Sequence, residues 1–122
     1  MTPDVLIVED SAIAVRLVRA ALSDLGAAFR TAADGEAGLA QIRLQPPDLL
    51  VLDLGLPSLD GWAVLEWVRS HPPTASLPVI VITGLGGDRL ADRAAEAGAD
   101  AFFSKPFSQS ALLETADRLL RA

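Results

Sequence analysis

Five side chains suited to chemistry stand directly after short apolar runs of the sequence. Glu9 and Asp10 follow one run, Asp53 follows a second, and Thr83 and Lys105 follow two others. If these runs are neighbouring strands, the chain brings three carboxylates, one hydroxyl and one ammonium group together. Three carboxylates repel one another, so such a cluster is stable mainly with a cation. The pattern therefore predicts a cation site with a hydroxyl and an ammonium group beside it.

The ligand types indicate which cation and which reaction this site would suit. Oxygen ligands without His or Cys favour a hard ion such as Mg²⁺, or Mn²⁺ in its place. A carboxylate nucleophile beside such an ion can form an aspartyl phosphate, because the metal neutralises the incoming phosphoryl group. Lysine and threonine can hold two of its oxygens. Lys105 is the only lysine, whereas nine other basic residues are arginine, which indicates that this position needs a compact charge.

The elements that must position these residues alternate along the chain. The apolar runs predict five strands: Val5–Val8, Ala27–Ala33, Leu49–Leu52, Pro78–Ile82 and Ala101–Ser104. Helical spacing of apolar residues predicts a helix after each strand: Ser11–Leu25, Gly35–Leu44, Trp62–Ser70, Asp88–Ala97 and Ser108–Arg121. Continuously apolar strands are typical of a parallel sheet covered on both faces. We therefore predict a doubly wound (βα)₅ α/β fold, whose functional crevice lies at the carboxyl ends of the strands.

Composition excludes several other classes of function. The 122 residues have the length of one domain, and we predict a single domain over residues 1–122 without an output domain. No cysteine and one histidine exclude a thiolate site and a His-rich metal cage. The net charge of −6 argues against binding nucleic acid. With no basic leader and only strand-sized apolar runs, we expect a cytoplasmic protein without membrane association.

Four motifs, in this order, resemble those of response regulator receiver domains of two-component systems, typified by the chemotaxis response regulator. They are VLIVED (Val5–Asp10), LVLDLGLPSLDG (Leu50–Gly61), PVIVITG (Pro78–Gly84) and FFSKPF (Phe102–Phe107). The resemblance extends over essentially the whole chain. It implies a flavodoxin-like sheet with strand order 2-1-3-4-5.

The resemblance also implies a role for each residue of the cluster. Asp53 would be the phosphoacceptor. Glu9 and Asp10 would position Mg²⁺, with Asp53 and the backbone carbonyl of Gly55 as further metal ligands. Lys105 would pair with Asp53 and then with the phosphoryl group.

Three further positions concern switching and the lifetime of the phosphoryl group. Thr83 would bind a phosphoryl oxygen and act in the switch together with Phe102. Phe102 has no hydroxyl where the family frequently has Tyr, so packing alone would drive its inward rotation. Gly55 and Leu85 stand at positions that tune the phosphoryl lifetime in the family. Neither can orient an attacking water, and a glycine leaves room for water.

The implied function is phosphorelay signalling in the cytoplasm. A sensor histidine kinase or histidine phosphotransfer protein would donate the phosphoryl group and dock on the first helix, including Ala14 and Val15. Phosphorylation would remodel the face formed by helix four, strand five and helix five, which an unidentified downstream protein would read. The chain would be a monomer or a homodimer that forms on phosphorylation. It would catalyse only its own phosphorylation and dephosphorylation, and so would not be an enzyme with an external substrate.

Alternatives remain open for the whole chain and for single residues. A haloacid-dehalogenase-type phosphatase also uses an aspartate nucleophile, but has a second Asp where this chain has Gly55. A flavin-binding module needs a Ser/Thr/Gly-rich phosphate loop after the first strand, where this chain reads EDSAIA. A degenerate receiver could serve protein interaction alone. Taken singly, Asp10 could cap a helix together with Ser11, and Asp53 could be a turn residue.

Overall fold

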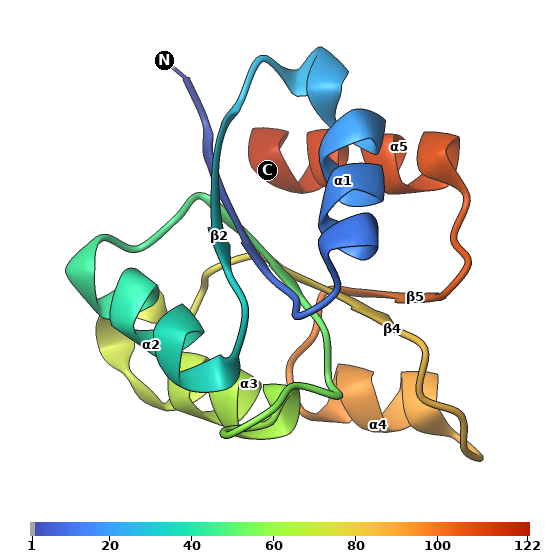
Figure 1. Cartoon of the computed structure of the whole chain (residues 1–122). Helices are drawn as coiled ribbons and strands as arrows, with labels where there is room; N and C mark the ends of the chain where they lie inside the picture. The colour runs from blue at the N-terminus through green and yellow to red at the C-terminus, as the bar shows by residue number, and fades with distance from the viewer. Residues whose placement is uncertain (1) are drawn as a thin grey trace.

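A computed structural model describes residues 2–122 and shows strands that alternate with helices along the chain (Figure 1). The strands are β1 (Asp4–Val8), β2 (Ala28–Ala32), β3 (Leu49–Leu52), β4 (Val79–Thr83) and β5 (Ala101–Ser104). The α-helices are α1 (Ala12–Ala21), α2 (Gly35–Leu44), α3 (Gly61–Ser70), α4 (Leu90–Glu96) and α5 (Gln109–Arg121). Short 3₁₀ turns occupy Ser23–Leu25 (η1) and Pro72–Thr74 (η2).

The sheet confirms the predicted fold class and strand order. All four strand pairs are parallel, and the order is β2-β1-β3-β4-β5. Helices α1 and α5 cover one face, and α2, α3 and α4 cover the other (Figure 1). Within residues 2–122, every helix is too short or too polar to cross a membrane.

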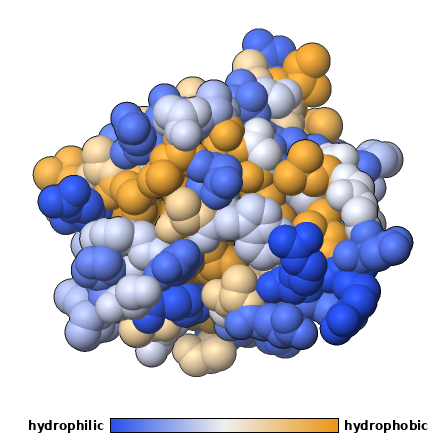
Figure 2. Space-filling model, turned by 90° about the horizontal axis from the view of Figure 1, so that it is seen from below, coloured by the Kyte–Doolittle hydropathy of each residue, from blue (hydrophilic) through white to orange (hydrophobic). Residues whose placement is uncertain are grey.

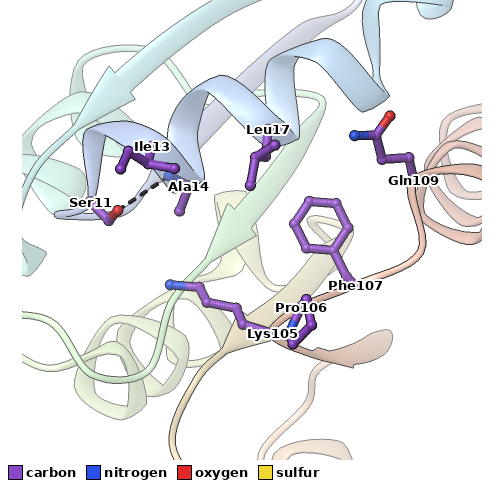
Figure 3. Close-up of a pocket in the computed structure, with 8 residues that line it drawn as sticks. All are labelled: Ser11, Ile13, Ala14, Leu17, Lys105, Pro106, Phe107 and Gln109. Carbon is purple, nitrogen blue, oxygen red and sulfur yellow. Dashed lines mark hydrogen bonds between the residues drawn. The ribbon is translucent and has the colours of Figure 1, made fainter.

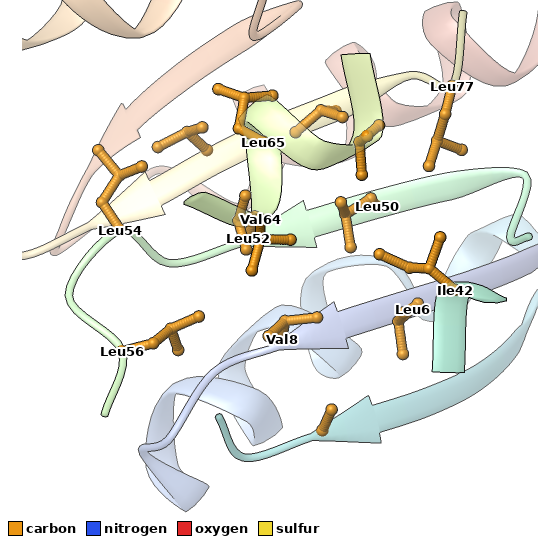
Figure 4. Close-up of a cluster of buried hydrophobic side chains, with 14 of the residues drawn as sticks. Leu6, Val8, Ile42, Leu50, Leu52, Leu54, Leu56, Val64, Leu65 and Leu77 are labelled. Atoms are coloured by element: carbon orange, nitrogen blue, oxygen red, sulfur yellow. The ribbon is translucent and has the colours of Figure 1, made fainter. Parts of the chain in front are cut away.

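Two apolar cores hold the sheet between its helices. Alternate residues of β1 point to opposite faces: Leu6 and Val8 belong to the core under α2 and α3, whereas Val5 and Ile7 belong to the core under α1 and α5. This burial on both faces explains why the strands are continuously apolar. The first core also includes Leu54 and Leu56 from the loop after β3 (Figure 4). On the outside, the face seen in Figure 2 mixes hydrophilic and hydrophobic residues.

Helix α1 differs from its predicted form in two ways. It ends at Ala21, and the η1 turn completes the segment that the sequence predicts as one helix to Leu25. Ile13 and Leu17 share the apolar spacing of α1, but they are 70% and 45% exposed. Ala14 and Val18 occupy the buried row instead, since only one side of a surface helix can face the core. The exposed pair therefore forms an apolar strip on the surface.

Oxygen side chains begin four of the five α-helices. Ser11 Oγ accepts a hydrogen bond from the Ala14 N–H at 3.2 Å and thereby caps α1. The side chains of Asp34, Asp60 and Ser108 cap α2, α3 and α5 in the same way. Ser11, and not Asp10, is thus the cap of α1, so the capping alternative for Asp10 is wrong.

Candidate functional site

The carboxyl ends of β1 and β3 bring the predicted acidic residues together. Asp53 is placed by its backbone N–H, which donates to the Val8 carbonyl at 3.0 Å. Glu9 and Asp53 are only 6% and 7% exposed, whereas Asp10 is exposed. One carboxylate oxygen from each of Glu9, Asp10 and Asp53 can be chosen so that all three lie within 4.8 Å of one another. This acidic pocket is the predicted cluster.

Lys105 connects two of these carboxylates from the end of β5. Its Nζ lies 3.3 Å from Asp53 Oδ2 and also donates a hydrogen bond to Glu9 Oε1. The pairing with Asp53 was predicted, but the pairing with Glu9 was not. Since the side chain of Lys105 is 26% exposed, water reaches the outer side of this contact. The ammonium group thus offsets part of the repulsion between the buried carboxylates.

Two backbone N–H groups orient the remaining polar atoms of the site. The Gly55 N–H donates to Asp53 Oδ1 at 3.1 Å, so both oxygens of Asp53 have a donor beside them. The Leu85 N–H donates to the hydroxyl of the fully buried Thr83 at 3.2 Å. Because that hydroxyl accepts from Leu85, its own hydrogen remains available to donate to an acceptor in the pocket.

Burial and mutual contact shift the protonation of three groups. Burial, together with the nearby Asp53, raises the pKa of Glu9 from 4.5 to about 7 despite the contact with Lys105. Burial also acts to raise the pKa of Asp53, but Glu9, the Gly55 N–H and Thr83 outweigh it and hold this pKa below its usual 3.8. Burial acts to lower the pKa of Lys105, but Glu9 and Asp53 outweigh it and raise this pKa above 10.5. At neutral pH, the carboxyl group of Asp53 is therefore ionised. The carboxyl group of Glu9 is protonated part of the time.

The donor set of the pocket fits a hard divalent ion. Glu9, Asp10 and Asp53 offer only carboxylate oxygens, which are the ligands that Mg²⁺ prefers. The exposed side of Asp10 would leave room for the waters that Mg²⁺ usually keeps. The Gly55 carbonyl as a further ligand stays a prediction.

Two features of the loop after Asp53 escaped the sequence analysis. A Cβ on Gly61 would lie 2.1 Å from the carbonyl oxygen of Asp53, so only glycine lets α3 begin this close to the backbone of Asp53. The second feature concerns Gly55, where the sequence predicts open space because glycine has no side chain. A Cβ there would lie 3.4–3.5 Å from side-chain atoms of Leu85, so Leu85 lies on one side of Gly55, which is itself exposed. The DG pair at Asp60–Gly61 was the only sequence signal for the first feature.

Phe102 lies on β5, away from the carboxylates. It is half-buried and packs against the core under α2, α3 and α4. Its backbone pairs with Val81, two residues before Thr83 on β4. The switch role of Phe102 stays a prediction.

Comparison with known proteins gives the family. The profile of the response regulator receiver domain matches residues 5–117. The chain belongs to this family. Receiver domains are phosphorylated by histidine kinases and are typically not true enzymes. An acidic triad such as Glu9, Asp10 and Asp53 is typical of their Mg²⁺ site.

Several receiver domains are similar over nearly the full length of this one. The "Probable chemotaxis protein CheY" of Rhizobium etli is 37% identical over 85% of this chain and 81% of its own length. The "Probable transcriptional regulator ycf27" of Cyanophora paradoxa is 39% identical over 96% of this chain, which spans about half (48%) of that relative. The solved structure of the BeF3-activated DrrB receiver domain has a TM-score of 0.88 at 29% identity, with both chains covered completely.

Proposed function

We propose that this receiver domain accepts a phosphoryl group on Asp53, in a reaction that requires Mg²⁺, from a histidine kinase or a histidine phosphotransfer protein. The observation that carries the proposal is the state of Asp53. It is buried, its pKa is held below the usual range, and Lys105 and the Gly55 N–H flank its two oxygens. An ionised carboxylate with fixed orientation is the required nucleophile. The similarity to the DrrB receiver domain, which is activated by BeF3, supports a response to phosphorylation.

The roles of the chain's own groups follow from the geometry. A carboxylate oxygen of Asp53 attacks the phosphorus of the phosphohistidine, the P–N bond breaks, and the imidazole leaves. Lys105 transfers its contact from Asp53 to an oxygen of the arriving group, and the Thr83 hydroxyl donates to another. Glu9 and Asp10 would hold Mg²⁺ together with Asp53. When bound, this ion neutralises charge on the phosphoryl oxygens.

A groove beside the pocket suits the phosphodonor protein (Figure 3). It lies between α1 and the segment that follows β5, and its lining residues are mostly apolar: Ser11, Ile13, Ala14, Leu17, Lys105, Pro106, Phe107 and Gln109. A donor that docks here would present its phosphohistidine next to Lys105. Ala14 lines the groove, whereas Val15 packs against the core beneath α1. Ile13 and Leu17 provide the exposed apolar contact instead.

The output would follow from movement of Thr83 and Phe102. When Thr83 turns toward the phosphoryl group, it leaves space beside β4, and Phe102 can pack inward without a hydroxyl to satisfy. The face of α4, β5 and α5 would change shape for a downstream partner, or for a second copy of the chain. An interaction-only receiver would not need the pairing of Lys105 with two buried carboxylates, Glu9 and Asp53. A phosphatase of the haloacid-dehalogenase type would need an acid where Gly55 stands.

The deciding experiment is intact mass after incubation with acetyl phosphate, in Mg²⁺ and in EDTA. We expect one phosphoryl gain that requires Mg²⁺ and disappears in Asp53→Asn. Asp60→Asn is the matched control, because Asp60 lies seven residues further along, is exposed and caps α3, and Asn caps helices equally well. A gain that persists in Asp53→Asn would refute the assignment. A folded protein that neither acetyl phosphate nor a phosphorylated kinase labels would favour the interaction-only alternative.

A further inference from the structure

One arginine fastens the carboxyl end of α4. The guanidinium of Arg69, near the end of α3, donates to the Gly98 carbonyl through Nε at 2.9 Å and through Nη2 at 2.7 Å. Its Nη1 donates to the carbonyls of Leu77 at 2.7 Å and Ala75 at 3.2 Å. The same side chain therefore ties the turn after α4 to the segment that leads into β4.

A carboxylate and a glycine complete this attachment. Asp100 Oδ2 accepts from Arg69 Nη2 at 3.0 Å and from the Val79 N–H at 2.8 Å. Gly98 has a φ of +106°, a conformation that other residues rarely adopt. A Cβ at this position would lie 2.8 Å from Arg69 Nε. The turn thus requires glycine at position 98, and Arg69 fills the space beside it.

The amino end of α4 is attached quite differently. Arg89 precedes the helix with a φ of +59° and makes no side-chain cap. Its ion pairs with Asp92 and Glu96, at 3.6 and 3.8 Å, join side chains that are about 70% exposed, and such pairs contribute little. Leu90 is buried there, but apolar contact is non-directional and allows sliding. Among the described residues, Arg69 thus fixes the carboxyl end by several hydrogen bonds, whereas the amino half has the apolar contact of Leu90 and one cation–π contact, from Arg93 to the Trp62 ring at 5.1 Å.

The loosely held end is also the end connected to the pocket. The Leu85 N–H donates to the Thr83 hydroxyl. From there the chain passes through Gly86 and Gly87, where an added Cβ would meet nothing within 4 Å, to Arg89. A shift of the Thr83 hydroxyl would therefore pull on this loop and on the first turn of α4.

We propose that α4 is a lever whose fixed end is the Arg69–Gly98–Asp100 attachment. Residues 84–93 move when the pocket is filled, while residues 95–100 stay in place. The trigger rests on the proposed function of Asp53, whereas the unequal attachment of the two ends does not. Arg69 is a positioning residue. By holding the carboxyl end of α4, it restricts movement of the α4–β5–α5 face to the amino end of α4.

Hydrogen exchange followed by mass spectrometry tests the lever in the whole chain. Exchange is compared in EDTA, in Mg²⁺, and in Mg²⁺ with beryllium fluoride as the phosphoryl analogue. We expect exchange in residues 84–93 to change by about fivefold or more, and in residues 95–100 by less than about twofold. Equal changes in both segments would overturn the proposal, as would no change in residues 84–93 of a protein that acetyl phosphate labels at Asp53.

Arg69→Lys tests the fixed end directly, with Arg89→Lys as the matched control at the other end of α4. One ammonium group cannot reach the four acceptors that the guanidinium spans. Even without Mg²⁺ or beryllium fluoride, Arg69→Lys should speed exchange of the amides at residues 97–99 by about tenfold, and Arg89→Lys should leave them unchanged. Uniform acceleration along α4 in Arg69→Lys would overturn the lever. This arm gives its answer even if Asp53 is never labelled, so the two proposals fail separately.

Discussion

Replacing Glu9 by glutamine should change how stability depends on pH in the metal-free protein. The folded-state pKa of Glu9 is about 7, against an ordinary value of 4.5. Between these values the folded state binds more protons than the unfolded state, so the free energy of unfolding falls as pH rises from 4.5 to 7. Glutamine resembles the protonated carboxyl at every pH. Glu9→Gln should therefore not show this fall.

The size of the effect follows from the two pKa values. A carboxyl with pKa 4.5 unfolded and about 7 folded lowers the free energy of unfolding by about 2–3 kcal/mol between about pH 5 and about pH 8. Lys105 limits the size of this effect, because its contact with Glu9 lowers the pKa that burial and Asp53 raise. The neighbouring groups do not interfere in this window. The lowered pKa of Asp53 matters below 3.8, and the raised pKa of Lys105 matters above 10.5.

Urea unfolding in EDTA, followed by tryptophan fluorescence at several pH values, measures the difference. As pH rises, the free energy of unfolding of the wild type should fall relative to that of Glu9→Gln. The two free energies should converge toward about pH 5. Glu66→Gln is the control, since Glu66 is exposed on α3, and its profile should run parallel to wild type. If Glu9→Gln also runs parallel to wild type, Glu9 does not hold the proton and the reasoning fails.

Three other substitutions test the site and its surroundings. Gly61→Ala places a Cβ against the backbone of Asp53 and should lower the free energy of unfolding by about 3 kcal/mol or more in urea, whereas Gly86→Ala, in open space, should have little effect. Lys105→Arg keeps the charge but replaces a compact group by a planar one, so labelling by acetyl phosphate should slow by about tenfold or more; an unchanged rate would contradict the role of the lysine. Leu85→Ala removes the apolar side chain beside Gly55 and should shorten the phosphoryl lifetime, seen as mass loss, by about threefold; an unchanged lifetime would show that Leu85 does not exclude water.

The strand ends were predictable because two independent patterns agree there. Continuous apolar runs mark buried parallel strands, and the polar residue after each run marks the functional edge. Asp53 and Lys105 could thus be placed close together although 52 positions separate them. The helix boundaries were less certain, because α1 ends in a 3₁₀ turn that keeps the same apolar spacing.

The contacts that the sequence did not predict depend on three-dimensional proximity without a local signal. Nothing near Glu9 in the sequence indicates that Lys105 reaches it, since the reach depends on how far β5 extends beyond its neighbour. The proximity of Leu85 to Gly55 depends on contact between the loop after β4 and the loop after β3. Arg69 is one of nine arginines, and only the fold shows that four backbone and side-chain acceptors converge on its guanidinium.

The site has no local origin, because β1, β3, β4 and β5 each contribute to it from a separate part of the chain. The chemical reactivity of Asp53 therefore depends on whether the strands of the sheet are correctly paired. β5 is an edge strand, hydrogen-bonded only to β4, and it leads into Lys105. If β5 separated from β4, the ammonium group of Lys105 would move away from Asp53. Asp53 would then lose its reactivity while most of the core stayed folded. The rate of phosphorylation would then report edge opening long before unfolding becomes visible.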